Sequence, residues 1–502
     1  MRICFVAEGC YPYVVGGVSS WIHSMIRSFL NIEFVLLTIV SDRSMRGKFV
    51  YELPSNLTEV YEVYISDQDW DKSHHKGKRI NLTDAEYNAV RSLLLNNDIR
   101  WHDLYRMFQK KRFSIDDLLM SRDFLDIIKE VYDQSYSQII FTDFLWTMRS
   151  IYLPLFTVMK SEFPKADLYH CVATGYSGIL GCMAKDKFDC KLMVSEHGIY
   201  TREREEELIK ADWVANAYKT IWSEQFKKMS LVAYHESDLV TSLFEKARKL
   251  QIELGCPEEK TRVTSNGIDV ARLANCRGRL AEDEAYINIG AVLRVTPIKD
   301  LKTMILAFAY AKAKCSNLKL WIMGPMDEEP KYAQECFDLV DMLNVRDVIF
   351  TDRIDVRDYL GRMDMTILTS ISEGQPLTIL ESYAVKKPVI ATNVGDCQEL
   401  IYGGAEDQEG TAGILTHIMD VDEITNAILT LARDPELRTK MGEAGYRRVN
   451  KYYQLRQMQE KYREIYKEMA EACHCEWSDS EFKIENEVKK RGWHWNKAHK
   501  DL

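Results

Sequence analysis

Short apolar runs alternate with stretches of helical periodicity along most of this chain, and the alternation starts again near the middle of the sequence. Runs rich in Val, Ile and Phe between helical patterns are typical of a parallel sheet that helices cover on both faces. We expect strands at 3–7, 34–39, 168–171, 192–195, 239–241, 286–292, 318–323, 348–350, 365–368 and 389–391. The sequence therefore predicts an α/β protein with two doubly wound, Rossmann-like domains.

The length of the chain and its polar segments suggest where these domains begin and end. At 502 residues the chain exceeds one ordinary core, since domains have about 100 to 200 residues. A polar run, RLANCRGRLAEDE, separates the two sets of strands, so we expect a first domain at 1–275 and a second at 276–440. A charged, helix-favouring stretch at 42–139 is expected as a helical insert in the first domain. Helices at 441–472 are expected to cross back to the first domain, before a polar tail at 473–502.

Composition and charge exclude several classes of protein. A hydrophobic share of 46% with 28% charged residues is typical of a soluble globular protein. The net charge of -10 argues against a nucleic-acid-binding surface, and no window reaches the roughly 18 uncharged apolar residues that span a bilayer. The twelve cysteines are scattered singly, many in apolar runs, as reduced thiols are in a cytosolic enzyme. We expect a cytoplasmic protein, with attachment to the inner face of a membrane as an open alternative.

The C-terminal tail begins with a close set of potential metal ligands, Cys473-His474-Cys475, and His494 and His499 lie downstream. The set lacks a second pair at the spacing of zinc sites, so we expect no metal there. The tail ends in KKRGWHWNKAHK, where basic residues surround two tryptophans. This ending is either a segment that docks on a membrane surface or a partner, or a solvated tail whose tryptophans pack on the protein. The second interpretation is favoured.

A glycine pair, Gly16-Gly17, follows the first predicted strand and opens an amphipathic helix. Two glycines let a ligand approach the backbone closely, and the first N–H groups of a helix favour an anion or a polar oxygen. This is the position of a phosphate or sugar contact in doubly wound folds. Taken alone, a tight turn without a ligand is the simpler explanation of the pair.

The stretch ISEGQPLTILES, residues 371–382, carries two glutamates around a predicted helix start. Pro376 suits the first helical position because its missing N–H is not needed there. The backbone N–H groups of Leu377, Thr378 and Ile379 are then expected to be unpaired at the positive end of the helix dipole, which favours a phosphate. Glu373 precedes this position and Glu381 follows it by about one and a half turns. Carboxylates accept hydrogen bonds from pairs of hydroxyls, so the layout matches a nucleotide sugar.

Cationic and polar residues near the ends of other strands complete the candidate site. Arg294 and Lys299 follow the first strand of the second domain, where an arginine can hold phosphate oxygens as a fork and a lysine as a point charge. His197 follows a strand of the first domain, and its neutral imidazole could bond a sugar hydroxyl across the cleft between the domains. Asn266 belongs to an SNGID turn before the second domain. Each of these features alone is explained as well by an ordinary turn or a surface residue.

Taken together, the pair Gly16-Gly17, the run EHGIYTRERE, NGID, the pair Arg294 and Lys299, and SEGQPLTILE resemble the retaining GT-B glycosyltransferases of the glycogen-synthase-like and sucrose-synthase-like group. The resemblance covers most of residues 1–470. Within that group, the opening GCYPYVVGGVSSW, the long insert and the EHGIYTRERE run are most similar to the Pel exopolysaccharide glycosyltransferases.

The resemblance implies a GT-B fold and transfer of a sugar with retention of configuration from a UDP-sugar to an oligosaccharide or polysaccharide acceptor, without an obligatory metal. It implies that Arg294 and Lys299 hold the diphosphate, that Glu381 bonds the ribose and that Glu373 bonds the donor sugar. His197 would contact that sugar near the reacting carbon. The remaining donor contacts implied are Gly16, Gly17, Asn266, Gly374, Gln375, Pro376, Leu377 and Thr378. Synthesis of a biofilm exopolysaccharide, together with membrane-embedded synthase or transport subunits, is the expected setting.

The residues leave alternatives open at this point. A nucleotide-sugar epimerase also has a GT-B fold, and a non-catalytic subunit of a membrane synthase could bind a UDP-sugar without turning it over. Epimer formation without an acceptor would indicate the first, and tight binding without turnover the second. The donor sugar, the linkage and the functions of the insert and the tail are not determined by the sequence.

Overall fold

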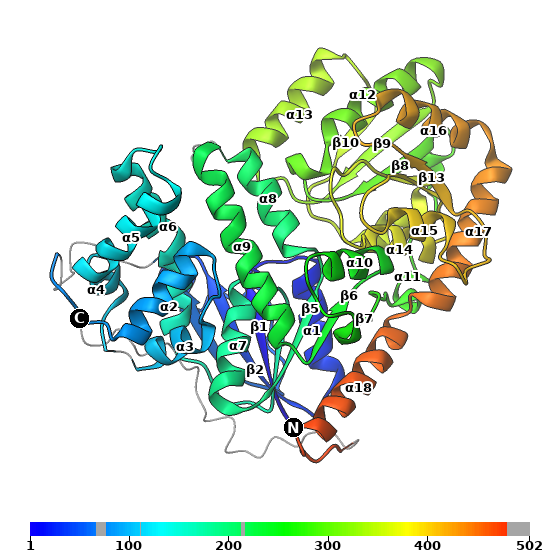
Figure 1. Cartoon of the computed structure of the whole chain (residues 1–502). Helices are drawn as coiled ribbons and strands as arrows, with labels where there is room; N and C mark the ends of the chain where they lie inside the picture. Colours follow the sequence, from blue (N-terminus) through cyan, green and yellow to red (C-terminus); the bar gives the residue numbers. More distant parts are fainter. Residues whose placement is uncertain (67–76, 111, 212–215, 479–502) are drawn as a thin grey trace. The chain divides into compact units, whose positions relative to one another are not determined.

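Two parallel sheets organise the chain, and each belongs to a separate unit of the structure (Figure 1). The computed structural model describes residues 1–66, 77–110, 112–211 and 216–478. Unit 1 comprises Met1–Ser242, Arg248–Val263 and the chain from Arg463 onward, and unit 2 comprises Leu243–Ala247 and Thr264–Tyr462. The predicted docking ending, KKRGWHWNKAHK, lies outside the described residues.

Unit 1 contains a seven-stranded sheet in the order β3-β2-β1-β4-β5-β6-β7, in which all neighbours are parallel. Its strands are β1 (Arg2–Glu8), β2 (Glu33–Val40), β3 (Leu57–Tyr64), β4 (Leu168–Cys171), β5 (Lys191–Glu196), β6 (Leu239–Ser242) and β7 (Thr261–Val263). The helices that connect them are α1 (Gly17–Ser28), α7 (Tyr176–Phe188), α8 (Tyr200–Lys210), α9 (Asn216–Glu236) and α10 (Glu245–Glu253). β1, β2 and β4 are almost wholly buried, which is why they read as continuous apolar runs.

The predicted helical insert at 42–139 differs from the structure in two respects. It contains β3, a full strand of the sheet, and its helical part continues to residue 160. The helices are α2 (Asp84–Leu95), α3 (Trp101–Gln109), α4 (Ile115–Leu119), α5 (Arg122–Ser135) and α6 (Phe141–Lys160), which group beside α9 (Figure 1). β3 was missed because it buries Glu59 and Glu62, which interrupt its apolar pattern. Arg2 compensates Glu59 at 3.0 Å and the Tyr13 hydroxyl donates to Glu62.

Unit 2 contains a six-stranded parallel sheet in the order β10-β9-β8-β11-β12-β13. Its strands are β8 (Ile287–Val292), β9 (Leu318–Met323), β10 (Val348–Phe350), β11 (Met365–Leu368), β12 (Val389–Thr392) and β13 (Gly413–Thr416). Its helices are α11 (Val270–Leu273), α12 (Leu301–Lys314), α13 (Pro330–Met342), α14 (Leu377–Ala384), α15 (Cys397–Tyr402), α16 (Val421–Arg433), α17 (Pro435–Tyr452) and α18 (Leu455–Ala472), which ends in unit 1.

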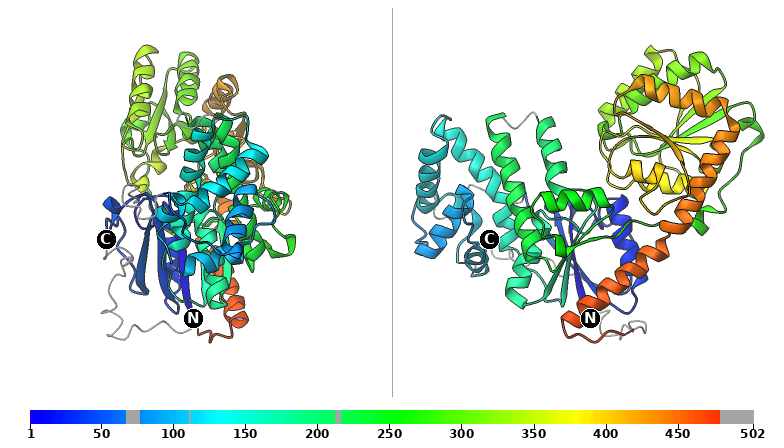
Figure 2. Two further views of the ribbon diagram at one scale, coloured as in Figure 1. Left: turned by 60° about the vertical axis from the view of Figure 1, so that its left-hand side comes forward. Right: turned by 45° about the vertical axis from the view of Figure 1, so that its right-hand side comes forward.

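Successive residues of the unit 2 strands point into two separate core layers. Ile367 and Ile390 pack with α12 and α16 on one face, whereas Leu368, Val389 and Ala391 pack with α14, α15 and α17 on the other. Helices accordingly lie on both faces of the sheet (Figure 2). The period of two along a strand produces this division, and the doubly wound fold predicted from the sequence is confirmed.

The strand order reverses once in each sheet, and these reversals determine where loops gather. From β8 the chain proceeds outward to β9 and β10, and from the neighbouring β11 it proceeds the other way to β12 and β13. The corresponding reversal in unit 1 lies between β1 and β4. Helices that follow the two neighbouring strands leave toward opposite faces, so the loops after these strands meet at their carboxyl ends, the position where doubly wound sheets bind ligands.

The ten predicted strands are all present, and β3, β7 and β13 are additional. The division between the units falls at Val263 and Thr264, earlier than the predicted boundary at 275. The reason is that the segment after Thr264 bonds to unit 2, since the N–H of Ile268 donates to the carbonyl of Tyr453 at 3.0 Å. All twelve cysteines are free thiols. None of the helices in the described ranges is long and apolar enough to cross a membrane.

Arg448→Met should destabilise unit 2 strongly. Arg448 on α17 is fully buried, pairs with Asp407 and donates to the carbonyls of Leu400 and Ile401 at 3.0 Å each. Its loss leaves a buried carboxylate and buried carbonyls without partners, which costs about 3 to 5 kcal/mol. Chemical denaturation measures the change. Arg447→Met removes a pair in which the arginine is 53% exposed and Glu409 keeps a second partner, Lys451, so it should cost at most about 1 kcal/mol. Equal losses in the two variants would contradict this interpretation.

Candidate functional site

The loop after β11 leads into α14 at the reversal of the unit 2 sheet. α14 begins at Leu377, one residue later than predicted, and Pro376 is its N-cap, so no side chain caps the first turn. The N–H of Ile379, predicted to be unpaired, donates to the carbonyl of Pro376 at 3.2 Å because the first turn is tight. Leu377 and Thr378 therefore supply the backbone N–H groups that remain at the positive end of the helix.

Lys299 and Glu373 form an ion pair at this reversal. Nζ of Lys299 lies 2.5 Å from Oε1 of Glu373, and the two side chains are 16% and 12% exposed. Ser370, which the sequence analysis missed, donates from its hydroxyl to the same carboxylate oxygen at 2.5 Å. Two further hydrogen bonds join the loops after β8 and β11. The hydroxyl of Thr369 donates to the Lys299 carbonyl at 3.0 Å, and the N–H of Ile371 donates to the Ile298 carbonyl at 2.9 Å. A cation and a carboxylate are thus held together where a doubly wound sheet binds ligands.

Arg294 is more exposed and has another partner. Its guanidinium pairs at 2.8 Å with Glu328, which lies in the loop after β9, and the side chains are 46% and 34% exposed. An ion pair at this exposure contributes at most about 1 kcal/mol. The guanidinium can therefore exchange Glu328 for an anionic ligand at little cost, whereas Lys299 is held more firmly.

Glu381 lies in α14 without a partner. Its carboxyl group is partly buried and forms no hydrogen bond or ion pair with another described residue. Burial raises the pKa of Glu381 to about 7, and the positive charge of Arg272 on α11 opposes this rise. Arg272 was not singled out by the sequence analysis. A half-charged carboxyl group with unused acceptor oxygens can bind a pair of hydroxyls.

Gln375 and Asn266 lie together in unit 2. The side-chain oxygen of Gln375 accepts from the Asn266 N–H at 2.7 Å, and its nitrogen donates to Asp396 at 2.6 Å. Asp396 is a residue that the sequence analysis missed, and burial raises its pKa well above the ordinary value. The amide of Gln375 is engaged at both ends, so donor binding through this side chain stays a prediction. Gly374 is joined to the same group, because its carbonyl accepts from the Asp396 N–H at 2.9 Å.

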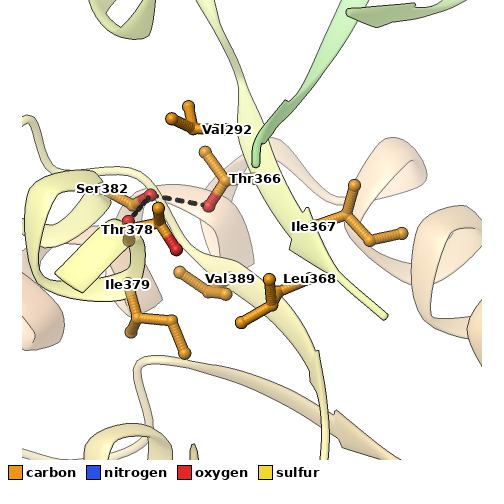
Figure 3. A pocket seen from close by; sticks show the side chains of 8 residues that line it. All are labelled: Val292, Thr366, Ile367, Leu368, Thr378, Ile379, Ser382 and Val389. Atoms are coloured by element: carbon orange, nitrogen blue, oxygen red, sulfur yellow. Dashed lines mark hydrogen bonds between the residues drawn. The ribbon is translucent and has the colours of Figure 1, made fainter. Parts of the chain in front are cut away.

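A small cavity lies beneath α14, between this helix and the strands of the sheet (Figure 3). Thr366 donates to the Ser382 hydroxyl at 2.9 Å, and Ser382 donates to the carbonyl of Thr378 at 2.7 Å. The other lining residues are Val292, Ile367, Leu368, Ile379 and Val389, so two residues predicted at the helix start, Thr378 and Ile379, line this cavity. These contacts fix α14 on the sheet, so the cavity belongs to the packing that positions the helix start.

The residues of unit 1 predicted to contact the donor are Gly16 and Gly17 at the start of α1 and His197 after β5. Gly16 is the N-cap of α1 in extended conformation and Gly17 is its first residue. A Cβ on either glycine would meet no atom within 4 Å, so the structure requires neither glycine for a turn or for packing. The ring of His197 lies 4.5 Å from that of Trp21, and burial lowers the pKa of His197 to about 4. Its imidazole is therefore neutral at pH 7, and its buried Nε2 has no hydrogen-bond partner among the residues that the structure describes.

Glu196, the residue before His197, stabilises the loop after β5 through its hydrogen bonds. The sequence analysis did not single it out as a functional residue. Its carboxylate accepts from the hydroxyls of Tyr234 at 2.6 Å and Thr174 at 3.1 Å, and from Gln251 at 2.9 Å. Burial raises the pKa of Glu196. Because its acceptor oxygens are occupied, Glu196 fixes the position of the loop after β5.

One group of side chains in the described ranges converges closely enough to hold a metal, namely His417, Asp420 and Glu423 near the exposed start of α16. These groups already bond one another, since His417 lies 2.9 Å from Glu423 and Asp420 accepts from the Glu423 N–H at 2.9 Å. Cys473-His474-Cys475 is not in this group. His494 and His499 lie outside the described residues.

Comparison with known families and proteins shows which of them the chain is similar to. The model of the family described as Domain of unknown function (DUF3492) matches residues 1–259, and that of the family described as Glycosyl transferases group 1 matches residues 286–434. N-acetyl-alpha-D-glucosaminyl L-malate synthase of Bacillus anthracis is 26% identical over 241 residues, 46% of this chain and 60% of that protein. MMP alpha-(1->4)-mannosyltransferase of Mycolicibacterium hassiacum is 22% identical over 294 residues, 58% of this chain and 67% of that protein.

Solved structures share the architecture over almost the whole chain. Anabaena HepE, in complex with UDP and glucose, has a TM-score of 0.57 at 14% identity, covering 93% of this chain and 99% of that one. Sucrose-phosphate synthase of Thermosynechococcus elongatus has a TM-score of 0.59 at 15% identity, covering 94% of this chain and 100% of that one. At these identities the similarity shows the fold, which is GT-B.

Glu381→Gln should alter the pH dependence of stability. Since the pKa of Glu381 rises from 4.5 to about 7 on folding, the folded state binds a proton in this range that the unfolded state does not. Its contribution to stability is full below pH 4.5 and is lost as the pH rises to about 7. Relative to the variant, the wild type should lose about 2 kcal/mol of unfolding free energy between about pH 5 and 7, measured by denaturation in urea. Glu464→Gln, exposed on α18, should show no such change; a similar change would contradict the assignment.

Proposed function

Because the chain belongs to the family described as Domain of unknown function (DUF3492) and also matches the glycosyl transferase group 1 family, we propose that it is a retaining glycosyltransferase. It moves a hexosyl or N-acetylhexosaminyl group from a UDP-sugar onto a growing polysaccharide, an exopolysaccharide of the Pel type. The twelve free cysteines favour a reducing compartment such as the cytoplasm, and membrane-embedded synthase subunits are its proposed partners.

The ion pair of Lys299 and Glu373 carries this proposal. The pair lies at the reversal between β8 and β11, beside the uncapped start of α14. Phosphate oxygens compete with Glu373 for the lysine, and the sugar hydroxyls compete with Lys299 for the carboxylate. A ligand that has a phosphate joined to a sugar satisfies both groups in one binding event. A free sugar or a free phosphate satisfies one of them.

The diphosphate is held by positive groups of unit 2. Lys299 supplies a point charge, Arg294 exchanges Glu328 for a fork of hydrogen bonds, and the N–H groups of Leu377 and Thr378 face the phosphate. In the reaction the bond between the sugar C1 and the diphosphate oxygen breaks, and negative charge grows on the departing UDP. Cations that are already in place stabilise this charge most in the transition state and so raise kcat.

Retention follows when the acceptor attacks from the face that UDP leaves. The acceptor oxygen bonds to C1, and its proton passes to an oxygen of the departing diphosphate. This step needs no protein nucleophile. His197 of unit 1 forms a hydrogen bond with a sugar hydroxyl through its buried Nε2. Because its imidazole is neutral, it adds no positive charge beside the reacting sugar. Glu381 accepts the two ribose hydroxyls when ionised.

Lys299→Met should abolish most of the activity without unfolding the protein. The experiment first identifies the donor as the nucleotide sugar that most raises the melting temperature among UDP-glucose, UDP-galactose and their N-acetyl forms. UDP release with an oligosaccharide acceptor is then measured. We expect kcat to fall about 100-fold in Lys299→Met.

Lys302→Met is the matched control, since Lys302 forms a more exposed pair with Glu335 on the next helix, at 43% and 41% exposure. It should retain kcat within about twofold, as a surface pair contributes little. Unimpaired turnover in Lys299→Met contradicts the assigned role. Epimer formation by the wild type without an acceptor, or tight UDP-sugar binding without turnover, contradicts the proposed activity.

Gly16→Ala and Gly17→Ala test the role of the glycine pair in unit 1. Neither glycine has a positive φ or a close neighbour, so the melting temperature should stay within about 2 °C of the wild type. An added methyl group at the helix start obstructs a ligand that approaches the backbone, so kcat/KM should fall about tenfold or more. Gly278→Ala, at an exposed glycine with open space around it, is the control. Full activity of both glycine variants would contradict the proposed contact of the pair with the ligand.

A further inference from the structure

The side-chain amide of Gln375 forms a hydrogen bond at each end, one through its oxygen and one through its nitrogen. The side chain is 6% exposed. The Asn266 N–H donates to its Oε1 at 2.7 Å, and its Nε2 donates to Oδ2 of Asp396 at 2.6 Å. The orientation of the amide follows from its partners, because a backbone N–H can only donate and must therefore meet the oxygen. Gln375 thus joins two segments that are far apart in sequence.

The segment that carries Asp396 is in direct contact with the backbone of the loop after β11. The Asp396 N–H donates to the Gly374 carbonyl at 2.9 Å. Gly395 has a φ of +51°, and a Cβ there would overlap the carbonyl oxygens of both Glu373 and Gly374. Glycine is needed at this position for conformation and for space. The bond between Gln375 and Asp396 therefore lies beside a backbone bond, and together they fix the peptide groups of Glu373 and Gly374.

The segment on the other side of Gln375 is also fixed. The N–H of Ile268, two residues after Asn266, donates to the Tyr453 carbonyl at 3.0 Å, and the Leu455 N–H donates to the Ile268 carbonyl at 2.9 Å. A Cβ on Gly267 would overlap the carbonyl of Gln454, so the two segments are in direct contact. Gln375 is therefore held between two segments that are themselves anchored in unit 2.

We propose that Gln375 and Asp396 are positioning residues, whose hydrogen bond holds the backbone of Glu373 and Gly374 so that the Glu373 carboxylate stays beside Lys299 and meets the sugar end of the donor. This inference rests on the proposed function. The bond does not hold Glu381, the proposed ribose contact, so binding of UDP alone depends on it less than binding of the UDP-sugar.

Amide hydrogen exchange of Asn266 tests the bond without reference to activity, because this N–H is itself the donor to Gln375. In Gln375→Met the thioether offers a weak acceptor, so the Asn266 amide should exchange at least about tenfold faster than in the wild type. Gln334→Met is the matched control. Gln334 on α13 donates to Asp338 at 2.8 Å in an exposed pair of the same chemistry. Unchanged protection of Asn266 in Gln375→Met overturns the inference even if the protein proves not to bind UDP.

Ligand affinity then tests the positioning. The probes are UDP and the UDP-sugar that most stabilises the wild type. Gln375→Met and Asp396→Ala should each weaken UDP-sugar binding about tenfold or more, and UDP binding clearly less. The double variant should lose no more than Gln375→Met alone, since that change already removes the bond between Gln375 and Asp396. The exposed pair, Gln334→Met and Asp338→Ala, should alter neither affinity.

The outcomes separate the inference from the proposed function. A wild type that binds no UDP-sugar contradicts the proposed function, whatever the variants do. A wild type that binds, with equal losses for UDP and UDP-sugar in Gln375→Met or additive losses in the double variant, contradicts the positioning role alone. Should Gln375→Met fail to fold, Asp396→Asn keeps an acceptor oxygen for Gln375. It must then protect Asn266 and bind the UDP-sugar better than Asp396→Ala does.

Discussion

The reversal of strand order between β8 and β11 is the constraint on which the candidate site depends. Parallel strands need crossover helices, and two neighbouring strands whose crossovers leave in opposite directions bring their following loops together at one edge. Lys299 comes from one of these loops and Glu373 from the other, 74 positions apart in the chain. Their contact follows from this feature of the topology, whereas the hydroxyl bond from Ser370 and the uncapped start of α14 arise within the loop after β11 itself.

The charged residues of the site differ in how tightly their partners within the protein hold them. Arg294 forms an exposed ion pair with Glu328, and Lys299 forms a mostly buried one with Glu373. Burial raises the pKa of Glu381 to about 7. The free energy needed to separate each group from its internal partner before it binds a ligand therefore rises with the burial of the pair. The proposed nucleotide sugar replaces each internal partner by one of its own polar groups, so that no buried charge is left unpaired.

Prediction from the sequence succeeded where the local pattern agreed with the tertiary environment. The apolar runs at 318–323 and 365–368 are strands with the predicted bounds because both are buried in the middle of a parallel sheet. β3 was missed because Glu59 and Glu62 are buried within it, each with a partner from elsewhere in the chain. The residues around Gln375 show the same limit. Nothing near Asp396 in the sequence indicates that it bonds a side chain 21 positions away.

The sequence by itself determined the α/β class, the two parallel sheets and the residue types at the loop after β11, since these depend on periodicity and on local turn chemistry. The tertiary structure alone decided which of those residues meet. It paired Lys299 with Glu373 and Arg294 with Glu328, and it engaged both ends of the Gln375 amide, while Glu381 has no hydrogen-bond partner within the described residues. The physical reason is that partners for buried charges and amides come from segments distant in the chain, and only the folded sheet brings these segments within hydrogen-bonding distance.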